Sequence, residues 1–175
     1  MTMTADELDG RMGEAWSGDR PNGSHINVVI AKRGTPTAAA IVGALAAPRP
    51  GHVPFLAVLE PGVLLRPITV VVNKVTIGPD PHGPITWGAG QLGISQGVLD
   101  AIADGLLDAA VAGSIVLLVA LWIEDAAGDE TAVRKATREA TRAALEDAVT
   151  DRSADFVRGV VDRREHASSY YYRGD

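Results

Sequence analysis

The sequence contains no cysteine, and this absence removes several kinds of chemistry at once. Disulfides, thiolate nucleophiles and cysteine metal sites are all excluded. Lysine is also scarce, since only Lys32, Lys74 and Lys135 occur among the 16 basic residues. The formal net charge is −6, and no basic run is present. Because phosphate binding needs clustered Lys and Arg, we expect no nucleic-acid partner.

A membrane-length apolar segment is missing as well. The most membrane-like stretch, residues 109–123, holds 15 uncharged residues, fewer than the roughly 20 that span a bilayer. It is more typical of a buried central strand. The first ten residues are acidic and carry no apolar run, so we expect no signal peptide, no membrane association and a cytoplasmic location. We expect no metal site either, because the histidines show none of the usual ligand spacings.

The order of predicted elements favours a single α+β domain. Strands are predicted over residues 25–30, 55–59, 68–77 and 114–123, and helices over residues 36–45, 90–106 and 129–149 and from Ser153. Strands grouped in this way predict a two-layer sandwich with helices on one face of a mixed sheet. We place the domain at residues 12–165, with a mobile N-terminal lead-in at 1–11 and a tail at 166–175.

The first predicted strand carries a titratable group. In His25-Ile-Asn27-Val-Val-Ile30 the side-chain period of two puts His25 and Asn27 on one face, opposite an aliphatic face. With an unperturbed pKa of about 6.5, histidine is well suited to general acid–base catalysis near neutrality. The plain alternative is a histidine at a strand edge that only bonds a neighbour.

Lys74 and Thr76 share a face of the third predicted strand with Val70 and Val72. A lysine in such an apolar strand is unusual, because burial of an unpaired ammonium group is costly. It either has a specific task or extends to water near the strand end.

Gln91 follows a glycine-rich segment, Trp87-Gly-Ala-Gly, that leads into a predicted helix. Such a junction can expose backbone N–H groups to a polar ligand. No dinucleotide-binding fingerprint and no Gly-x-Ser-x-Gly nucleophile elbow is present.

Six segments together resemble the formaldehyde-activating enzymes. They are Gly13-Glu14-Ala15, HINVVIAKRGTP from His25, LAVLEPGV from Leu56, RPITVVVNKVTI from Arg66, WGAGQLGISQGV from Trp87 and REATRAAL from Arg138. Their order and spacing match that family from about Gly13 to Leu145.

The resemblance implies a function in one-carbon metabolism. Family members are lyases that condense formaldehyde with tetrahydromethanopterin to a methylene adduct and water. They use no bound metal or redox cofactor, and they are homopentamers with sites between subunits. The likeness implies that His25 is the catalytic acid, and that the carrier contacts are Asn27, Leu56, Lys74, Thr76 and Gln91.

One departure keeps other functions open. Asn27 stands where the family has an aspartate, so a charge that could orient a histidine is missing. The first hypothesis is a hydro-lyase with His25 as general acid, acting on tetrahydromethanopterin or a similar reduced pterin. The second is a divergent protein that binds a pterin or an aldehyde without catalysis. The third is a Schiff base between an aldehyde and Lys74.

Overall fold

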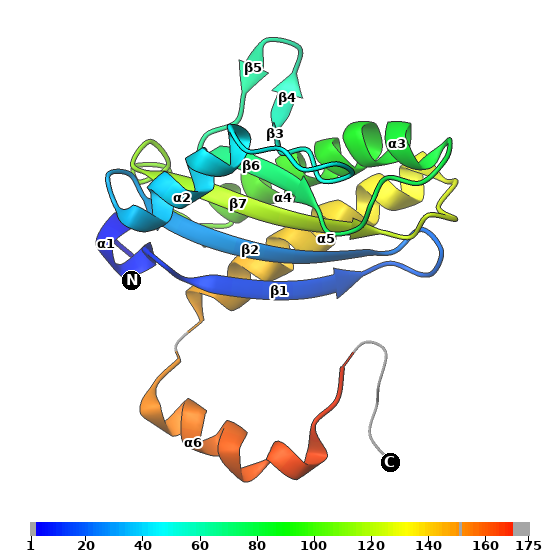
Figure 1. Cartoon of the computed structure of the whole chain (residues 1–175). Coiled ribbons are helices and arrows are strands. Elements are labelled where there is room, and N and C mark those ends of the chain that lie inside the picture. Colours follow the sequence, from blue (N-terminus) through cyan, green and yellow to red (C-terminus); the bar gives the residue numbers. More distant parts are fainter. Residues whose placement is uncertain (1–2, 151, 170–175) are drawn as a thin grey trace.

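The computed structural model describes residues 3–150 and 152–169, and its centre is a five-stranded mixed sheet (Figure 1). The strand order is β1-β2-β7-β6-β3, in which β6 and β7 are parallel and the other neighbours are antiparallel. The strands are β1 (Met12–Ser17), β2 (Ser24–Lys32), β3 (Phe55–Leu56), β6 (Ile68–Asn73) and β7 (Ile115–Ile123). The predicted α+β architecture with a mixed sheet is confirmed.

Helices cover one face of this sheet. α5 (Glu130–Val149) packs on β1 and β2, and α4 (Gln91–Ala103) packs on α5. α4 continues from α3 (His82–Ile85) through a π-helical turn, η1 (Thr86–Gly90). The core lies between this helical layer and the sheet, where β2 contributes Ile26, Val28 and Ile30, each at most 1% exposed.

α2 (Pro36–Leu45) is the exception, because it packs on the opposite face of the sheet (Figure 1). It forms a second cluster with Ala31, Val70 and Val116. Thr35 caps it by accepting a hydrogen bond from the amide of Ala38. α2 covers only part of this face. The remainder, which carries His25, Asn27 and Trp122, is called the open face below.

The segment predicted as a mobile lead-in, residues 1–11, contains a short helix, and its mobility stays a prediction. α1 (Ala5–Leu8) has a capping box between Thr4 and Glu7, and Leu8 is buried in the core. Residues 1 and 2 lie outside the described part. β1 was also absent from the predicted elements, although it falls within the predicted domain. Its core-facing residues are Gly13 and Ala15, which are too small to produce an apolar alternation.

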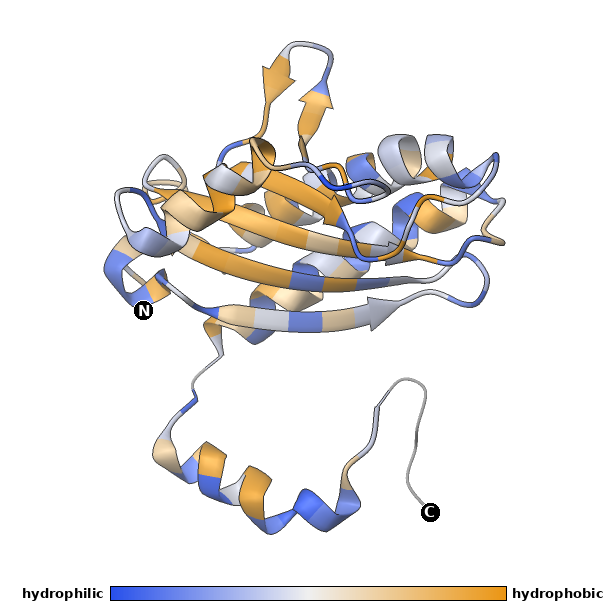
Figure 2. Ribbon diagram, in the orientation of Figure 1, coloured by the Kyte–Doolittle hydropathy of each residue, from blue (hydrophilic) through white to orange (hydrophobic). Residues whose placement is uncertain are grey.

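Three further elements lie at the periphery. The hairpin of β4 (Val58–Glu60) and β5 (Val63–Leu64) stands away from the sheet and is largely apolar (Figure 2). α6 (Ala154–Asp162) and the 3₁₀ turn η2 (Arg164–His166) follow α5, and none of their residues is buried. Residues 170–175 of the expected tail lie outside the described residues, and the boundaries of the domain stay a prediction. In the described part of the chain, no helix combines the length and the apolarity that a membrane span requires.

Gly13 allows β1 to approach α5 closely. A Cβ at this position would lie 2.1 Å from the carbonyl oxygen of Ala144 and 2.5 Å from the amide nitrogen of Ala148. Because these are backbone atoms, Gly13→Ala must push the strand away from the helix. We expect a loss of about 2–3 kcal/mol in the free energy of unfolding, measured by urea denaturation.

Gly43 is the matched control, since it lies on the exposed side of α2 and a Cβ there meets nothing within 4 Å. Gly43→Ala should stabilise the protein by about 0.5–1 kcal/mol. Equal effects of the two substitutions would contradict the close packing of β1 on α5.

Candidate active site

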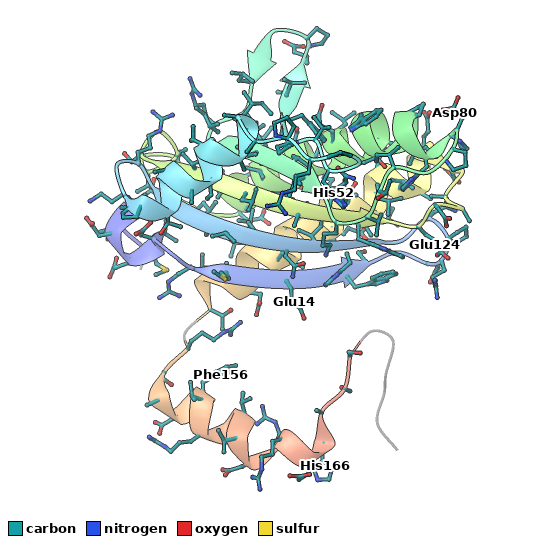
Figure 3. The ribbon with its side chains drawn as sticks, in the orientation of Figure 1. Glu14, His52, Asp80, Glu124, Phe156 and His166 are labelled. Carbon is teal, nitrogen blue, oxygen red and sulfur yellow. The ribbon has the colours of Figure 1, made fainter. Side chains whose placement is uncertain are left out.

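Four polar side chains, from two strands and the end of a third, meet on the open face. Glu14 comes from β1 (Figure 3), His25 and Asn27 come from β2, and Lys74 follows the last residue of β6. The antiparallel register places Glu14 opposite Asn27. Lys74 reaches β2 across the intervening strand β7, where the residue paired with Asn27 is Ala120, whose small side chain leaves room. We call these four residues the polar cluster.

The polar cluster is a closed ring of contacts. Nζ of Lys74 lies 2.8 Å from Nδ1 of His25 and donates to Oδ1 of Asn27 at 2.7 Å. On the other side, Oε2 of Glu14 lies 3.2 Å from Nε2 of His25 and accepts from Nδ2 of Asn27 at 3.3 Å. His25 and Asn27 are therefore both held between a nitrogen base and a carboxylate.

These contacts determine the tautomer of His25. Since Lys74 has only donors to offer in its charged form, Nδ1 of His25 must accept. Nε2 then carries the proton of the neutral ring and points at the Glu14 carboxylate. We assign the Nε2–H tautomer on this basis.

Burial lowers the pKa of both Lys74 and His25. Burial lowers the pKa of Lys74 to about 8, and the negative charge of Glu14 opposes this shift. Burial also lowers the pKa of His25 below its ordinary 6.5, and the neighbouring Lys74 charge adds to the effect. The Glu14 carboxylate acts in the opposite direction on His25 through its hydrogen bond and its charge. At neutral pH the ring is therefore mainly neutral and Lys74 is partly deprotonated.

Two indole rings border the polar cluster. Trp16 of β1 is paired with His25, which is in turn paired with Trp122 of β7. The ring centroids of Trp16 and Trp122 are 5.2 Å apart, and that of Trp16 is 6.4 Å from the His25 ring. Flat apolar surface of this kind can receive a planar ring next to the polar groups.

Two of the other predicted site residues lie near this face. Leu56 pairs with Val70 and packs in the cluster under α2, on the same side of the sheet as Lys74. Thr76 is not in a strand, because β6 ends at Asn73 rather than at the predicted residue 77. It is exposed and lines a hollow of about 290 Å³ together with Trp122.

Gln91 lies elsewhere, in the helical layer that covers the other face of the sheet. Its Nε2 donates to the carbonyl of Val58 at 2.6 Å and to Oγ of Ser95 at 2.9 Å. The expected open junction before Gln91 is wrong, because helical structure already begins at His82. The glycines lie inside the helical run, where Gly90 permits close contact with Ile123.

Glu14 was missed as a site residue. The sequence analysis noted it only as part of Gly13-Glu14-Ala15. Because no strand was predicted there, its side chain could not be assigned to a face of the sheet. Its alternation with Trp16 along β1 is the signal that could have placed it beside His25. Among the described residues, no group of three or more His, Asp or Glu side chains is arranged to hold a metal ion.

Glu14→Gln tests the role of the carboxylate directly. Removal of its charge should lower the pKa of His25 further, because Glu14 is the group that raises it. The measurement is an NMR titration of the His25 ring. Glu60→Gln, an exposed position on the hairpin, is the control and should leave the His25 pKa where it is. An unchanged His25 pKa in Glu14→Gln would show that the contact is absent in solution.

Comparison with known proteins gives consistent results. The model of the formaldehyde-activating enzyme family matches residues 12–171. A 5,6,7,8-tetrahydromethanopterin hydro-lyase of Methanosarcina barkeri is 38% identical over 133 residues, which are 76% of this chain and 75% of the relative. A bifunctional enzyme Fae/Hps of Methanothrix thermoacetophila is 30% identical over 122 residues.

The bifunctional relatives are much longer proteins. The match to the Methanothrix thermoacetophila enzyme covers 70% of this chain but 31% of the relative. The corresponding enzyme of Archaeoglobus fulgidus is 28% identical, and 30% of its length is covered. The family match and the 38% identity over most of both chains agree with the resemblance found in the sequence. The chain belongs to the formaldehyde-activating enzyme family.

Proposed function

We propose that this protein is a hydro-lyase that condenses formaldehyde with tetrahydromethanopterin to the methylene adduct and water. The observation that carries the proposal is the His25 imidazole, held on the open face between the nitrogen of Lys74 and the carboxylate of Glu14. The hydro-lyase of Methanosarcina barkeri supports it by its name and its similarity.

The reaction needs an acid at one step. A carrier amine adds to formaldehyde to give a carbinolamine, which must lose its hydroxyl group as water before an iminium can form. We assign the donation of that proton to His25. Glu14 favours the charged ring, because its carboxylate lies next to Nε2. A second carrier amine then closes the ring. Holding the aldehyde and the carrier together lowers the barrier further.

Asn27 favours a second candidate function, a protein that binds a pterin or an aldehyde without turnover. An amide at this position carries no charge. However, Glu14 places a carboxylate oxygen 3.3 Å from Nδ2 of Asn27 and 3.2 Å from His25. A negative charge is therefore still present beside the histidine, and we favour catalysis.

The remaining site and assembly assignments belong to the same proposal. Asn27, Leu56, Lys74, Thr76 and Gln91 are proposed carrier contacts, and a homopentamer in the cytoplasm stays a prediction. The β4–β5 hairpin exposes Leu59, Val63 and Leu64, each more than 40% accessible, close to the carbonyl that Gln91 binds. Apolar side chains of this kind are typical of a contact between subunits, which could bring Gln91 to the open face of a neighbour.

The test is the rate of adduct formation from formaldehyde with tetrahydromethanopterin and, separately, with tetrahydrofolate. Each reaction is compared with a sample without protein. Acceleration with tetrahydromethanopterin supports the proposal. Acceleration with tetrahydrofolate alone would show that the carrier is tetrahydrofolate and not tetrahydromethanopterin. Equilibrium binding of a carrier without any acceleration would establish the second candidate function instead.

A further inference from the structure

The Lys74 nitrogen has an unusual set of neighbours. Two acceptors lie within hydrogen-bond distance, Nδ1 of His25 at 2.8 Å and Oδ1 of Asn27 at 2.7 Å. A neutral amine has two N–H bonds and one lone pair, so these acceptors can bind both hydrogens of the uncharged form. The lone pair is then left for an electrophile. The ammonium form would carry a third proton at that position.

The surroundings also shift the titration of Lys74 toward the uncharged amine. Neither of its two direct partners is negatively charged, since Asn27 is an amide and the His25 ring accepts as a neutral base. The charged group that stabilises the ammonium is Glu14, and burial outweighs it. With a pKa of about 8, roughly a tenth of Lys74 is amine at pH 7, against less than a thousandth of an ordinary lysine.

We propose that Lys74 is a covalent catalyst that captures formaldehyde and passes the carbon to the carrier amine. The proposal rests on the condensation proposed above and assigns its first step to a residue of this chain. It gives Lys74 a role beyond that of a carrier contact.

The steps balance without any further reactant. The Lys74 lone pair adds to the carbonyl carbon, and a proton shift gives the neutral carbinolamine Nζ–CH₂–OH. Protonation of its hydroxyl releases water and leaves an iminium between Nζ and the methylene carbon. A carrier amine attacks that carbon, and a proton moves from the carrier nitrogen to Nζ. Nζ then leaves as the free amine, and the second carrier amine closes the ring with loss of one proton.

His25 is positioned to donate the proton that removes water. In the charged ring Nδ1 also carries a proton, and because Nδ1 lies 2.8 Å from Nζ, a hydroxyl one carbon beyond Nζ is within reach of that proton. The Glu14 carboxylate binds the opposite nitrogen and stabilises the ring when it is charged. The order of groups is that of a carboxylate, an imidazole and a nucleophile.

Reductive trapping tests the proposal on the full chain. The protein is given a short pulse of formaldehyde with cyanoborohydride at pH 7, without carrier, and methylated lysines are mapped by mass spectrometry. Lys32 and Lys135 are internal controls, because each forms an ion pair with an exposed carboxylate. We expect methylation of Lys74 to exceed that of either control at least tenfold. In a second sample, carrier added before the reductant should remove the label.

Asn27→Asp is the matched variant. A carboxylate beside Nζ stabilises the ammonium, so labelling of Lys74 should fall severalfold while labelling of Lys32 stays the same. Equal labelling of all three lysines in the wild type would overturn the capture step. If the wild type nevertheless accelerates adduct formation, the condensation stands and only the covalent route fails. Selective labelling of Lys74 in a protein that does not accelerate the reaction would overturn the condensation and leave the aldehyde capture.

Discussion

His25→Ala should lower the catalysed rate of methylene-adduct formation by about 10²–10⁴-fold, the contribution typical of a positioned general acid. The variant removes the ring that connects Lys74 with Glu14 and leaves both groups in place. His25 is on the open face and not in the core, so the circular dichroism spectrum should stay unchanged. The measurement is the initial rate with tetrahydromethanopterin, corrected for the reaction without protein.

Two further variants show whether this loss is specific to the His25 imidazole. His25→Gln keeps a polar side chain but cannot titrate, so its rate should fall as far as that of His25→Ala. His166→Ala changes an exposed histidine in η2 and should keep the wild-type rate. A wild-type rate in His25→Ala would exclude the histidine as the acid.

Lys74→Met should have opposite effects on activity and stability. Activity should fall at least 10²-fold, because both the nucleophile and the donor to His25 are lost. At pH 7 the variant should be more stable than the wild type by about 1 kcal/mol. The full pKa shift corresponds to about 3 kcal/mol. Partial solvent exposure and the loss of two hydrogen bonds reduce this gain.

The sign of this stability change follows from the two pKa values of Lys74, about 8 in the folded protein and about 10.4 in the unfolded chain. Below pH 8 the lysine is charged in both states, and partial burial of the charge destabilises the fold. The penalty fades as the pH rises through 8 and is absent above about 10.4, where both states are neutral. The stability advantage of Lys74→Met, measured by urea denaturation, should therefore shrink from pH 7 to pH 10. Lys135→Met, at an exposed position, should show neither the gain nor its pH dependence.

Periodicity predicted the faces of β2 correctly. Ile26, Val28 and Ile30 are buried, and His25 and Asn27 share the other side. This succeeded because β2 is long, and large apolar residues mark its core face. β1 has the same alternation, but glycine and alanine mark its core face, and at Gly13 α5 lies too close for any side chain. A hydrophobicity pattern cannot reveal a face that is defined by small residues.

Only some of the residues that form the site could be predicted from the sequence. His25, Asn27 and Lys74 were all predicted, and the structure shows that Lys74 contacts both of the others. Their contacts could not be inferred from spacing, because Lys74 is 49 residues from His25 and reaches it across β7. Glu14 depended on the unrecognised strand. Gln91 was predicted to lie at an open helix start, but the helical run already begins at His82. The glycines before Gln91 do not reveal that the residues preceding them are helical.

We predict that the polar cluster acts as one catalytic unit in the condensation. The most direct measurement is a double-variant cycle with wild type, His25→Ala, Lys74→Met and the double variant, each assayed with formaldehyde and tetrahydromethanopterin. Residues that act as a unit lose activity non-additively. We predict that the wild type accelerates the reaction and that the double variant is about as slow as the slower single variant. A wild type no faster than the sample without protein, or two losses that multiply, would contradict the claim.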